Sequence, residues 1–153
     1  MSGEPADEGA AALYRRDACS QALGIEIVAA SGRRAVARML VRPDMCNGFG
    51  IVHGGMTFLL ADTAMAFASN AALDGSPGNV ALAASAEIDW LAPVREGDTI
   101  TATADQRWTN GRTAVWDIAV TNTAGDTVAL FRGRTRAIAR PADLPAQVVV
   151  SDG

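Results

Sequence analysis

The sequence contains no lysine, so all 13 of its basic residues are arginines. Histidine occurs once, at His53, and cysteine only at Cys19 and Cys46. The cysteines form no CxxC pair, and with one histidine a zinc or iron site would take most of its ligands from carboxylates. We therefore expect no metal site, and nothing in the chain points to a bound cofactor.

Acidic residues outnumber basic ones, so the net charge is −4 and the sequence pI is near 4.9. A protein that binds nucleic acid normally has a basic patch or a high pI, so we exclude this class of partner. The N-terminal stretch MSGEPADEGAA is acidic and lacks the apolar segment of a signal peptide. These features favour a reduced, cytoplasmic protein.

The composition is typical of a globular protein with one core, with 49% apolar and 20% charged residues in a chain of 153. We expect a single domain over residues 10–140. Residues 1–9 are expected to form a disordered N-terminus, and residues 141–153 a loose C-terminal tail.

Hydrophobic periodicity and turn signals predict helices and strands along the whole domain. One helix is expected from Ala10 to Leu23, ending at Gly24, and a long apolar helix from about Gly54 to Leu73. Strands are expected at 24–30, 34–41, 80–90, 98–109, 112–122 and 127–138, with turns or loops at 74–79, 93–97, 110–111 and 123–126. This order predicts an α+β fold in which a curved antiparallel sheet wraps the long helix.

The most informative stretch runs from Asn47 to Asn70, NGFGIVHGGMTFLLADTAMAFASN. Its helix has about the length of a membrane span, but Asp62, its one charge, lies in the middle and disfavours insertion, so we expect no membrane span. A buried carboxylate costs on the order of several kcal/mol unless it is paired, which indicates a function. The unpaired N–H groups at Gly54 and Gly55 suit the oxyanion of an attacked thioester or ester.

Asp62 lies eight residues after Gly54, which is about 12 Å along a helix that rises about 1.5 Å per residue. A carbonyl bound at the Gly54 N–H therefore cannot reach Asp62 of the same helix. If both groups serve one reaction, they come from two chains, and an antiparallel second copy would form two identical sites. The sequence thus predicts an obligate homodimer.

Each of these residues also has a simpler interpretation. Asp62 could be a buried carboxylate satisfied by backbone or hydroxyl partners. His53 could hydrogen-bond the loop instead of acting as a general acid or base, and Asn47 could be a turn residue, as Asn before Gly often is.

Arg132, Arg134 and Arg136 alternate along the last expected strand, so their side chains share one face. An arginine row of this kind suits the phosphates of a nucleotide-bearing substrate. The same pattern is equally typical of a solvated outer face.

The chain resembles the hotdog-fold thioesterases and, more closely, the phenylacetyl-CoA thioesterases of bacterial phenylacetate degradation. The resemblance covers 13–138 and rests on DACSQALGI (17–25), HGGMTFLLADTAMAFASN (53–70), DTITATADQR (98–107) and TVALFRGR (127–134). It implies protomers paired edge to edge into a homodimer, and commonly a homotetramer made of two dimers. The implied reaction is hydrolysis of phenylacetyl-CoA, or of ring-hydroxylated aryl-acetyl-CoA, to the free acid and coenzyme A.

The resemblance also implies roles for the residues that match its motifs. Asp62 would be the catalytic carboxylate, as general base or as nucleophile, and the Gly54 N–H would polarise the thioester carbonyl. Asn47 would help to place the water or the carbonyl, and His53 would support the loop and the substrate. The implied contacts to the acyl-CoA are Gly55, Ser85, Trp90, Arg95, Asn110, Gly111, Arg134 and Arg136.

Three other functions stay open at this point. The first is a thioesterase with broader acyl-CoA specificity. The second is a hotdog hydratase that pairs His53 with an acid, which would hydrate an enoyl-CoA without releasing thiol. The third is a non-catalytic dimer that binds acyl-CoA tightly without turnover.

Overall fold

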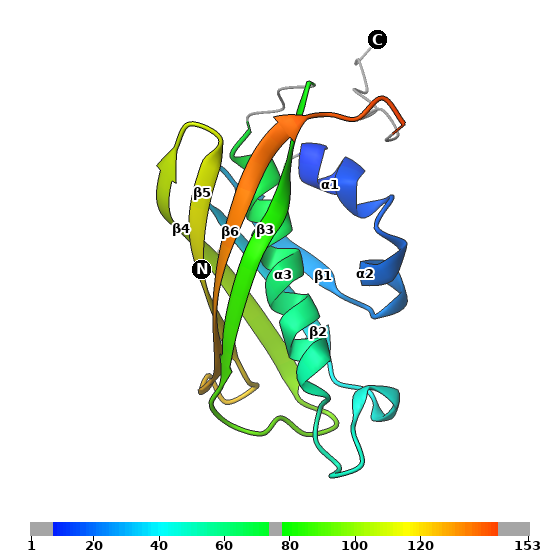
Figure 1. The fold of residues 1–153 in the computed structure, drawn as a ribbon. Helices are drawn as coiled ribbons and strands as arrows, with labels where there is room; N and C mark the ends of the chain where they lie inside the picture. The colour runs from blue at the N-terminus through cyan, green and yellow to red at the C-terminus, as the bar shows by residue number, and fades with distance from the viewer. Residues whose placement is uncertain (1–7, 74–77, 144–153) are drawn as a thin grey trace.

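One curved antiparallel sheet and the long helix α3 (Gly54–Ala71) dominate the computed structural model, which describes residues 8–73 and 78–143. Figure 1 shows α3 lying along the sheet, with the short helices α1 (Glu8–Tyr14) and α2 (Ala18–Ala22) beside it. The remaining elements are β1 (Glu26–Ser31), β2 (Arg34–Leu40), the 3₁₀ helix η1 (Pro43–Met45), β3 (Asn79–Trp90), β4 (Thr99–Asn110), β5 (Thr113–Thr121) and β6 (Thr127–Ala139). The expected α+β architecture is confirmed.

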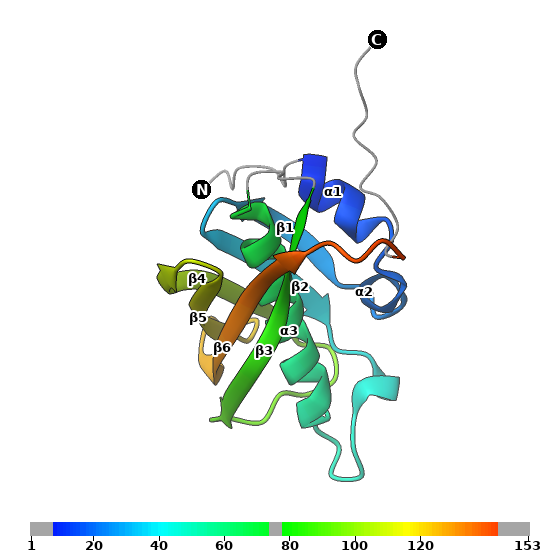
Figure 2. The same ribbon diagram turned by 45° about the horizontal axis from the view of Figure 1, so that its top comes forward.

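The sheet has the strand order β1-β2-β4-β5-β6-β3, and every neighbouring pair is antiparallel. β1 and β3 are therefore its edge strands. The view in Figure 2 shows how the strands curve around α3. None of the helices in the described part of the chain has the length and apolar character needed to cross a membrane.

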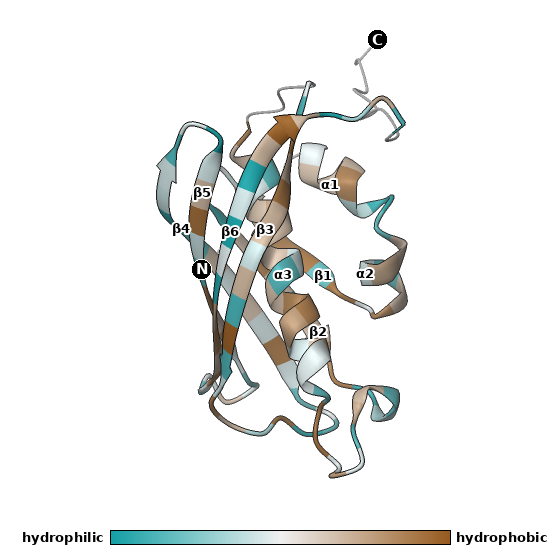
Figure 3. Cartoon of the chain, in the orientation of Figure 1, coloured by the Kyte–Doolittle hydropathy of each residue, from teal (hydrophilic) through white to brown (hydrophobic). Residues whose placement is uncertain are grey.

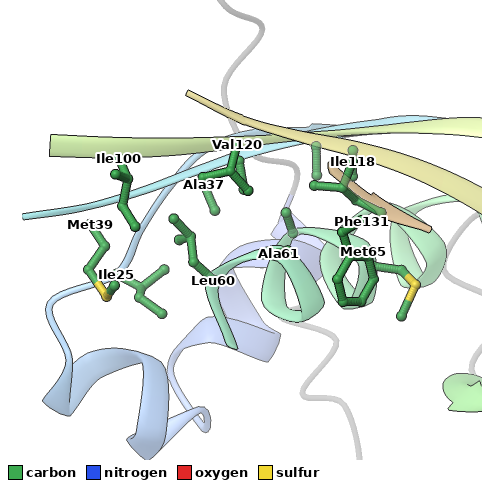
Figure 4. Packing of buried hydrophobic residues seen from close by; sticks show 14 of the residues in the cluster. Ile25, Ala37, Met39, Leu60, Ala61, Met65, Ile100, Ile118, Val120 and Phe131 are labelled. Atoms are coloured by element: carbon green, nitrogen blue, oxygen red, sulfur yellow. The ribbon is translucent and has the colours of Figure 1, made fainter. Parts of the chain in front are cut away.

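The core lies between α3 and the concave face of the sheet. Leu60, Ala61 and Met65 of α3 meet Ile118 and Val120 of β5, as Figure 4 shows, and all of them are buried. Figure 3 shows hydrophobic residues along much of α3. Burying a large apolar side chain stabilises a fold by roughly 1.5–3 kcal/mol, so these buried side chains are the main reason why α3 stays packed against the sheet.

The prediction of one helix from Ala10 to Leu23 is wrong in one respect. The structure has two helices in this segment, α1 and α2. Asp17 caps the second helix, its Oδ1 accepting a hydrogen bond of 2.9 Å from the Ser20 N–H. An Asp at this position stabilises a helix start, which interrupts the first helix after Tyr14. The predicted stop is confirmed, since α2 ends before Gly24, whose φ of +68° suits a residue just past a helix.

The turns and termini differ from expectation only in detail. The β4–β5 hairpin turns at Gly111 and Arg112, one residue later than expected, because Asn110 still pairs with Thr113 and Gly111 takes the positive φ of +56°. The helix α1 begins at Glu8, inside the segment expected to be disordered. Residues 1–7, most of the loop expected at 74–79 and most of the C-terminal tail lie outside the described residues.

The edge strand β3 is exposed on both faces over much of its length. All residues from Leu82 to Glu87 are exposed, whereas the adjacent strand β6 alternates between buried and exposed residues. Within one chain, α3 therefore does not cover the concave face of β3 between Leu82 and Glu87.

Candidate active site

A tight loop leads from β2 and η1 to the start of α3 and is stabilised mainly by Asn47. The Asn47 N–H donates to the Ile51 carbonyl at 2.8 Å, and the Asn47 carbonyl accepts from the Gly50 N–H at 3.0 Å. The Asn47 side-chain Oδ1 accepts from the Phe49 N–H at 2.9 Å. Asn47 is thus a turn residue, as the simpler interpretation proposed, while within the described residues its side-chain Nδ2 has no acceptor and stays available to a ligand.

His53 caps α3, so its ring supports the loop. His53 Nδ1 accepts a hydrogen bond from the Gly55 N–H at 3.1 Å, and the His53 carbonyl accepts from the Met56 N–H at 2.8 Å. Only an unprotonated nitrogen can accept, so the ring carries its hydrogen on Nε2 in this arrangement. The interpretation of His53 as a loop residue is therefore supported by geometry.

The Gly54 N–H is left without an acceptor among the described residues. The expectation of an unpaired N–H at Gly55 is wrong, because that group donates to the capping His53 Nδ1. Gly54 lies on the wall of a cavity of about 310 Å³. Most of the lining is apolar, and Asn47, Thr57 and Trp90 are its residues with polar groups in their side chains. An unpaired N–H at a helix start, next to an apolar cavity, can bind a carbonyl oxygen that gains negative charge.

Asp62 lies in the second turn beyond this cavity and does not line it. Its side chain is half-buried, and burial raises the pKa of its carboxyl above the ordinary value. Within the described part of the chain it has no hydrogen-bond or ion-pair partner, so the alternative of a carboxylate satisfied by its own chain does not hold. Because α3 is continuous, Asp62 stays about 12 Å from Gly54 along the axis.

The predicted substrate contacts fall at opposite ends of one chain. Trp90 pairs with Ala129 at the end of β3 near Gly54, and Arg95 follows in the next turn. Arg136 pairs with Leu82 and Thr113 at the other end of the sheet, close to the β4–β5 hairpin. The exposed Asn110 and Gly111 lie at this second end as well.

The three arginines of β6 share the outer face of the sheet, as their alternation predicts. Arg132 is paired with Asp117, Nε to Oδ1 at 2.7 Å, and this contact lowers the pKa of the Asp117 carboxyl. Arg134 and Arg136 form no ion pair with any described residue. Arg134 and Ser85 line one shallow hollow of about 310 Å³ on this face. Two uncompensated cations therefore lie beside the edge strand.

Thr57, a polar residue of the cavity, was not predicted from the sequence, and nor were several apolar residues of the lining. It follows Gly54 by three residues on α3, which places both on one helix face, so its position could have been inferred from helical periodicity. Val128 also lines the cavity. Its carbonyl accepts a hydrogen bond from the Leu91 N–H at 2.8 Å, which holds the loop after β3 beside β6. Among the described residues, no three His, Cys, Asp or Glu side chains gather as a metal site.

Comparison with known proteins places this geometry in a family. Residues 49–129 match the family model of the thioesterase superfamily. Acyl-coenzyme A thioesterase PaaI of Escherichia coli K12 is 45% identical over 131 residues, which is 86% of this chain and 90% of that protein.

Solved structures agree with the sequence comparison. The E. coli PaaI protein from the phenylacetic acid degradation operon superposes with a TM-score of 0.79, covering 86% of this chain and 91% of that one. The TT0310 protein of Thermus thermophilus, 35% identical, gives a TM-score of 0.72 and covers 79% of this chain and 97% of that one. The resemblance that the motifs indicated is confirmed, and the chain belongs to the thioesterase superfamily, with its hotdog fold.

Proposed function

We propose that the protein is an acyl-CoA thioesterase that hydrolyses phenylacetyl-CoA or ring-hydroxylated aryl-acetyl-CoA, as a step of phenylacetate degradation. The observation that carries the proposal is the unpaired Gly54 N–H on the wall of an apolar cavity, in a chain 45% identical to an acyl-coenzyme A thioesterase. The apolar lining suits an aryl group, and the hydrolysis needs only water besides the acyl-CoA. A reducing, cytoplasmic location fits the free thiols of Cys19 and Cys46.

In the proposed reaction, the thioester carbonyl oxygen binds at the Gly54 N–H, and the Asn47 amide lies on the same cavity wall. As a general base, Asp62 takes a proton from water as the water attacks the carbonyl carbon, the C–S bond breaks, and the proton passes to the thiolate of coenzyme A. As a nucleophile, Asp62 attacks that carbon and expels the thiolate, and water then hydrolyses the acyl-Asp62 anhydride and supplies the proton to the thiolate. A carboxylate whose pKa is raised by burial is a stronger base than an exposed one.

Each proposed site takes Gly54 from one chain and Asp62 from its partner. Two features support this assignment: the separation of the two residues along α3, and the uncovered edge strand β3. If two copies pair through β3 in antiparallel fashion, each covers the exposed side of the other's edge and the two helices run in opposite directions. Arg134 and Arg136 of one chain then come toward the Trp90 end of the partner. A homotetramer of two such dimers belongs to the same proposal.

Steady-state assays of thiol release from a panel of acyl-CoA esters test the activity. We expect phenylacetyl-CoA and its ring-hydroxylated forms to give the highest kcat/KM, and Asp62→Asn to lower kcat by at least about 10²-fold, the usual scale for a positioned acid or base. Thiol release of equal efficiency from straight-chain esters would instead support the broader thioesterase. Retention of most activity by Asp62→Asn would contradict the mechanism.

Mixing two inactive variants tests whether the site is shared. Asp62→Asn supplies an intact Gly54, and Gly54→Pro, which removes the backbone N–H at the first position of α3, supplies an intact Asp62. After unfolding and refolding together, half of the dimers are mixed and each has one intact site, so activity should return to about a quarter of the wild-type level. Activity no higher than the sum of the two variants would show that the sites lie within single chains.

The hydratase alternative finds less support. It needs His53 as a proton donor or acceptor at the substrate, whereas His53 does not line the cavity beside Gly54 and its Nδ1 accepts from the Gly55 N–H. Incubation with an enoyl-CoA, followed by separate measurement of hydration and of thiol release, distinguishes the two reactions. Binding of acyl-CoA without either product would favour the non-catalytic dimer.

A further inference from the structure

The peptide unit between Gly54 and Gly55 is held at both of its polar ends by side chains. Its carbonyl oxygen accepts a hydrogen bond of 3.2 Å from Trp90 Nε1. Its N–H donates to His53 Nδ1 at 3.1 Å. His53 belongs to the same helix start, whereas Trp90 comes from the end of β3, so the indole fixes this peptide unit relative to the sheet.

The preceding peptide unit is fixed as well. The His53 carbonyl accepts from the Met56 N–H at 2.8 Å. Since the described chain contains no cis peptide bond, the Gly54 N–H points opposite to that carbonyl, out of the helix start. Gly54 itself lines the cavity. With the peptide units on both sides of its Cα held in place, the direction of the Gly54 N–H is determined.

Two consecutive glycines give this helix start much backbone freedom, which the clamp reduces. Glycine has the largest backbone freedom of all residues, and the first turn of a helix has the fewest internal hydrogen bonds. Gly54 also cannot be replaced without disturbing the clamp, because a Cβ would lie 3.1 Å from Trp90 Nε1 and Cε2. The absence of a side chain at Gly54 therefore lets both the substrate and the indole approach the backbone closely.

We propose that Trp90 is a positioning residue: its indole N–H holds the Gly54–Gly55 peptide unit so that the Gly54 N–H is directed at the carbonyl oxygen of the bound thioester. This inference rests on the proposed thioesterase function and gives Trp90 a role beyond the contact with the acyl-CoA that the family resemblance implies. A donor that is already oriented stabilises a developing oxyanion without reorganising during the reaction.

The two parts of the Trp90 side chain have separable kinetic effects. The ring lines the cavity, so its loss weakens substrate binding and raises KM. The N–H does not bind the substrate but orients a group that interacts most strongly with the transition state, so its loss lowers kcat. Trp90→Phe removes the N–H and keeps an aromatic ring, which isolates the second effect.

The test compares Trp90→Phe with Trp108→Phe in assays with phenylacetyl-CoA. Trp108 is a matched control, since it is 52% exposed against 56% for Trp90, lies on β4 and makes no hydrogen bond from its ring to any described residue. We expect Trp90→Phe to lower kcat about tenfold with KM changed less than about twofold, a part of the 10²–10³-fold effect of removing an oxyanion donor altogether. Trp108→Phe should behave as the wild type.

Either of two results would overturn the proposal: a wild-type kcat in Trp90→Phe, or a raised KM with kcat unchanged, which would make Trp90 a binding wall only. If Trp90→Phe folds poorly, replacement of Trp90 by 3-benzothienylalanine retains the bicyclic shape and removes only the N–H. The same fall in kcat is then expected, and its absence counts equally against the role.

Amide NMR separates this inference from the proposed function, because it needs no substrate. In protein labelled with ¹⁵N-glycine, Trp90→Phe should shift the amide signals of Gly54 and Gly55 and speed hydrogen exchange at Gly55, while Trp108→Phe should leave both unchanged. Unchanged glycine signals in an active enzyme would refute the clamp alone. Altered signals in a protein that hydrolyses no acyl-CoA would refute the thioesterase proposal and leave the clamp intact.

Discussion

The side-chain amide of Asn70 pairs with both backbone polar groups of Ala81. Asn70 Nδ2 donates to the Ala81 carbonyl at 3.0 Å, and the Ala81 N–H donates to Asn70 Oδ1 at 3.0 Å. The amide takes the place of a neighbouring strand at this point of the edge. Since Trp90, at the other end of β3, bonds to Gly54, the edge strand is tied to both ends of α3. The position of the helix start relative to the exposed edge is thereby fixed.

Replacing Asn70 by Ala should loosen this connection. It removes the two bonds to Ala81 and a third from Asn70 Nδ2 to the Ala66 carbonyl at 2.9 Å. At about 0.5–1.5 kcal/mol for each bond, we expect the free energy of unfolding in urea to fall by about 2–3 kcal/mol. Ser69→Ala, which removes a single bond to the same Ala66 carbonyl, is the control and should cost about 1 kcal/mol. Equal losses in the two variants would show that the Ala81 pairing contributes nothing.

Much of the fold could be predicted because its signals are local. The uninterrupted apolar run after Gly54 predicts a buried helix, and α3 ends at Ala71, two residues before the expected end. The sequence pattern does not predict the break between α1 and α2 after Tyr14, because only the capping residue Asp17 marks the start of a new helix. A single capping side chain outweighs a helical pattern when the segment is short.

The candidate site could be predicted in part. The glycines and Asp62 stand out because each is unusual where it occurs, in a helix start or an apolar helix. The Trp90 contact with Gly54 joins residues 36 positions apart, and it depends on how β3 meets α3, which no local pattern records. The separation of Trp90 from Arg136 likewise follows from strand register, which becomes known only with the sheet order.

Gly133 is required where α3 packs on β6. A Cβ at this position would overlap Met65 Sδ and lie 2.9 Å from Phe131 Cε1, and both neighbours are buried. We expect Gly133→Ala to lower the free energy of unfolding by about 1–3 kcal/mol through overpacking. Gly48→Ala, where the new Cβ meets nothing within 4 Å, should be nearly neutral. Combining Gly133→Ala with Met65→Ala should cost less than the sum of the single variants, and strict additivity would exclude this contact as the cause.

Arg134 and Arg136 should contribute to binding of the nucleotide part of the substrate, since neither is engaged by an acidic residue in the described chain. Loss of one charge-assisted hydrogen bond to a phosphate corresponds to about a tenfold change, so Arg134→Gln or Arg136→Gln should raise KM for phenylacetyl-CoA about tenfold with kcat unchanged. Arg132→Gln, whose guanidinium is paired with Asp117, should have a smaller effect. The phenylacetyl thioester of N-acetylcysteamine lacks phosphates, and an equal rise in its KM would contradict the assignment.

Asp62 should lower the stability of the fold at neutral pH. Burial raises the pKa of its carboxyl in the folded state, so the folded chain holds the proton more tightly than the unfolded chain. The free energy of unfolding therefore falls as pH rises from the unfolded value, about 3.9, through the raised pKa. Asp62→Asn should have a higher Tm than the wild type at pH 7, and the difference should shrink as the pH falls toward 4.

Asp117→Asn is the control of opposite sign, because Arg132 lowers the pKa of the Asp117 carboxyl and the charged form stabilises the fold at neutral pH. A lower Tm for Asp62→Asn at pH 7 would mean that the carboxylate is paired in the assembled protein.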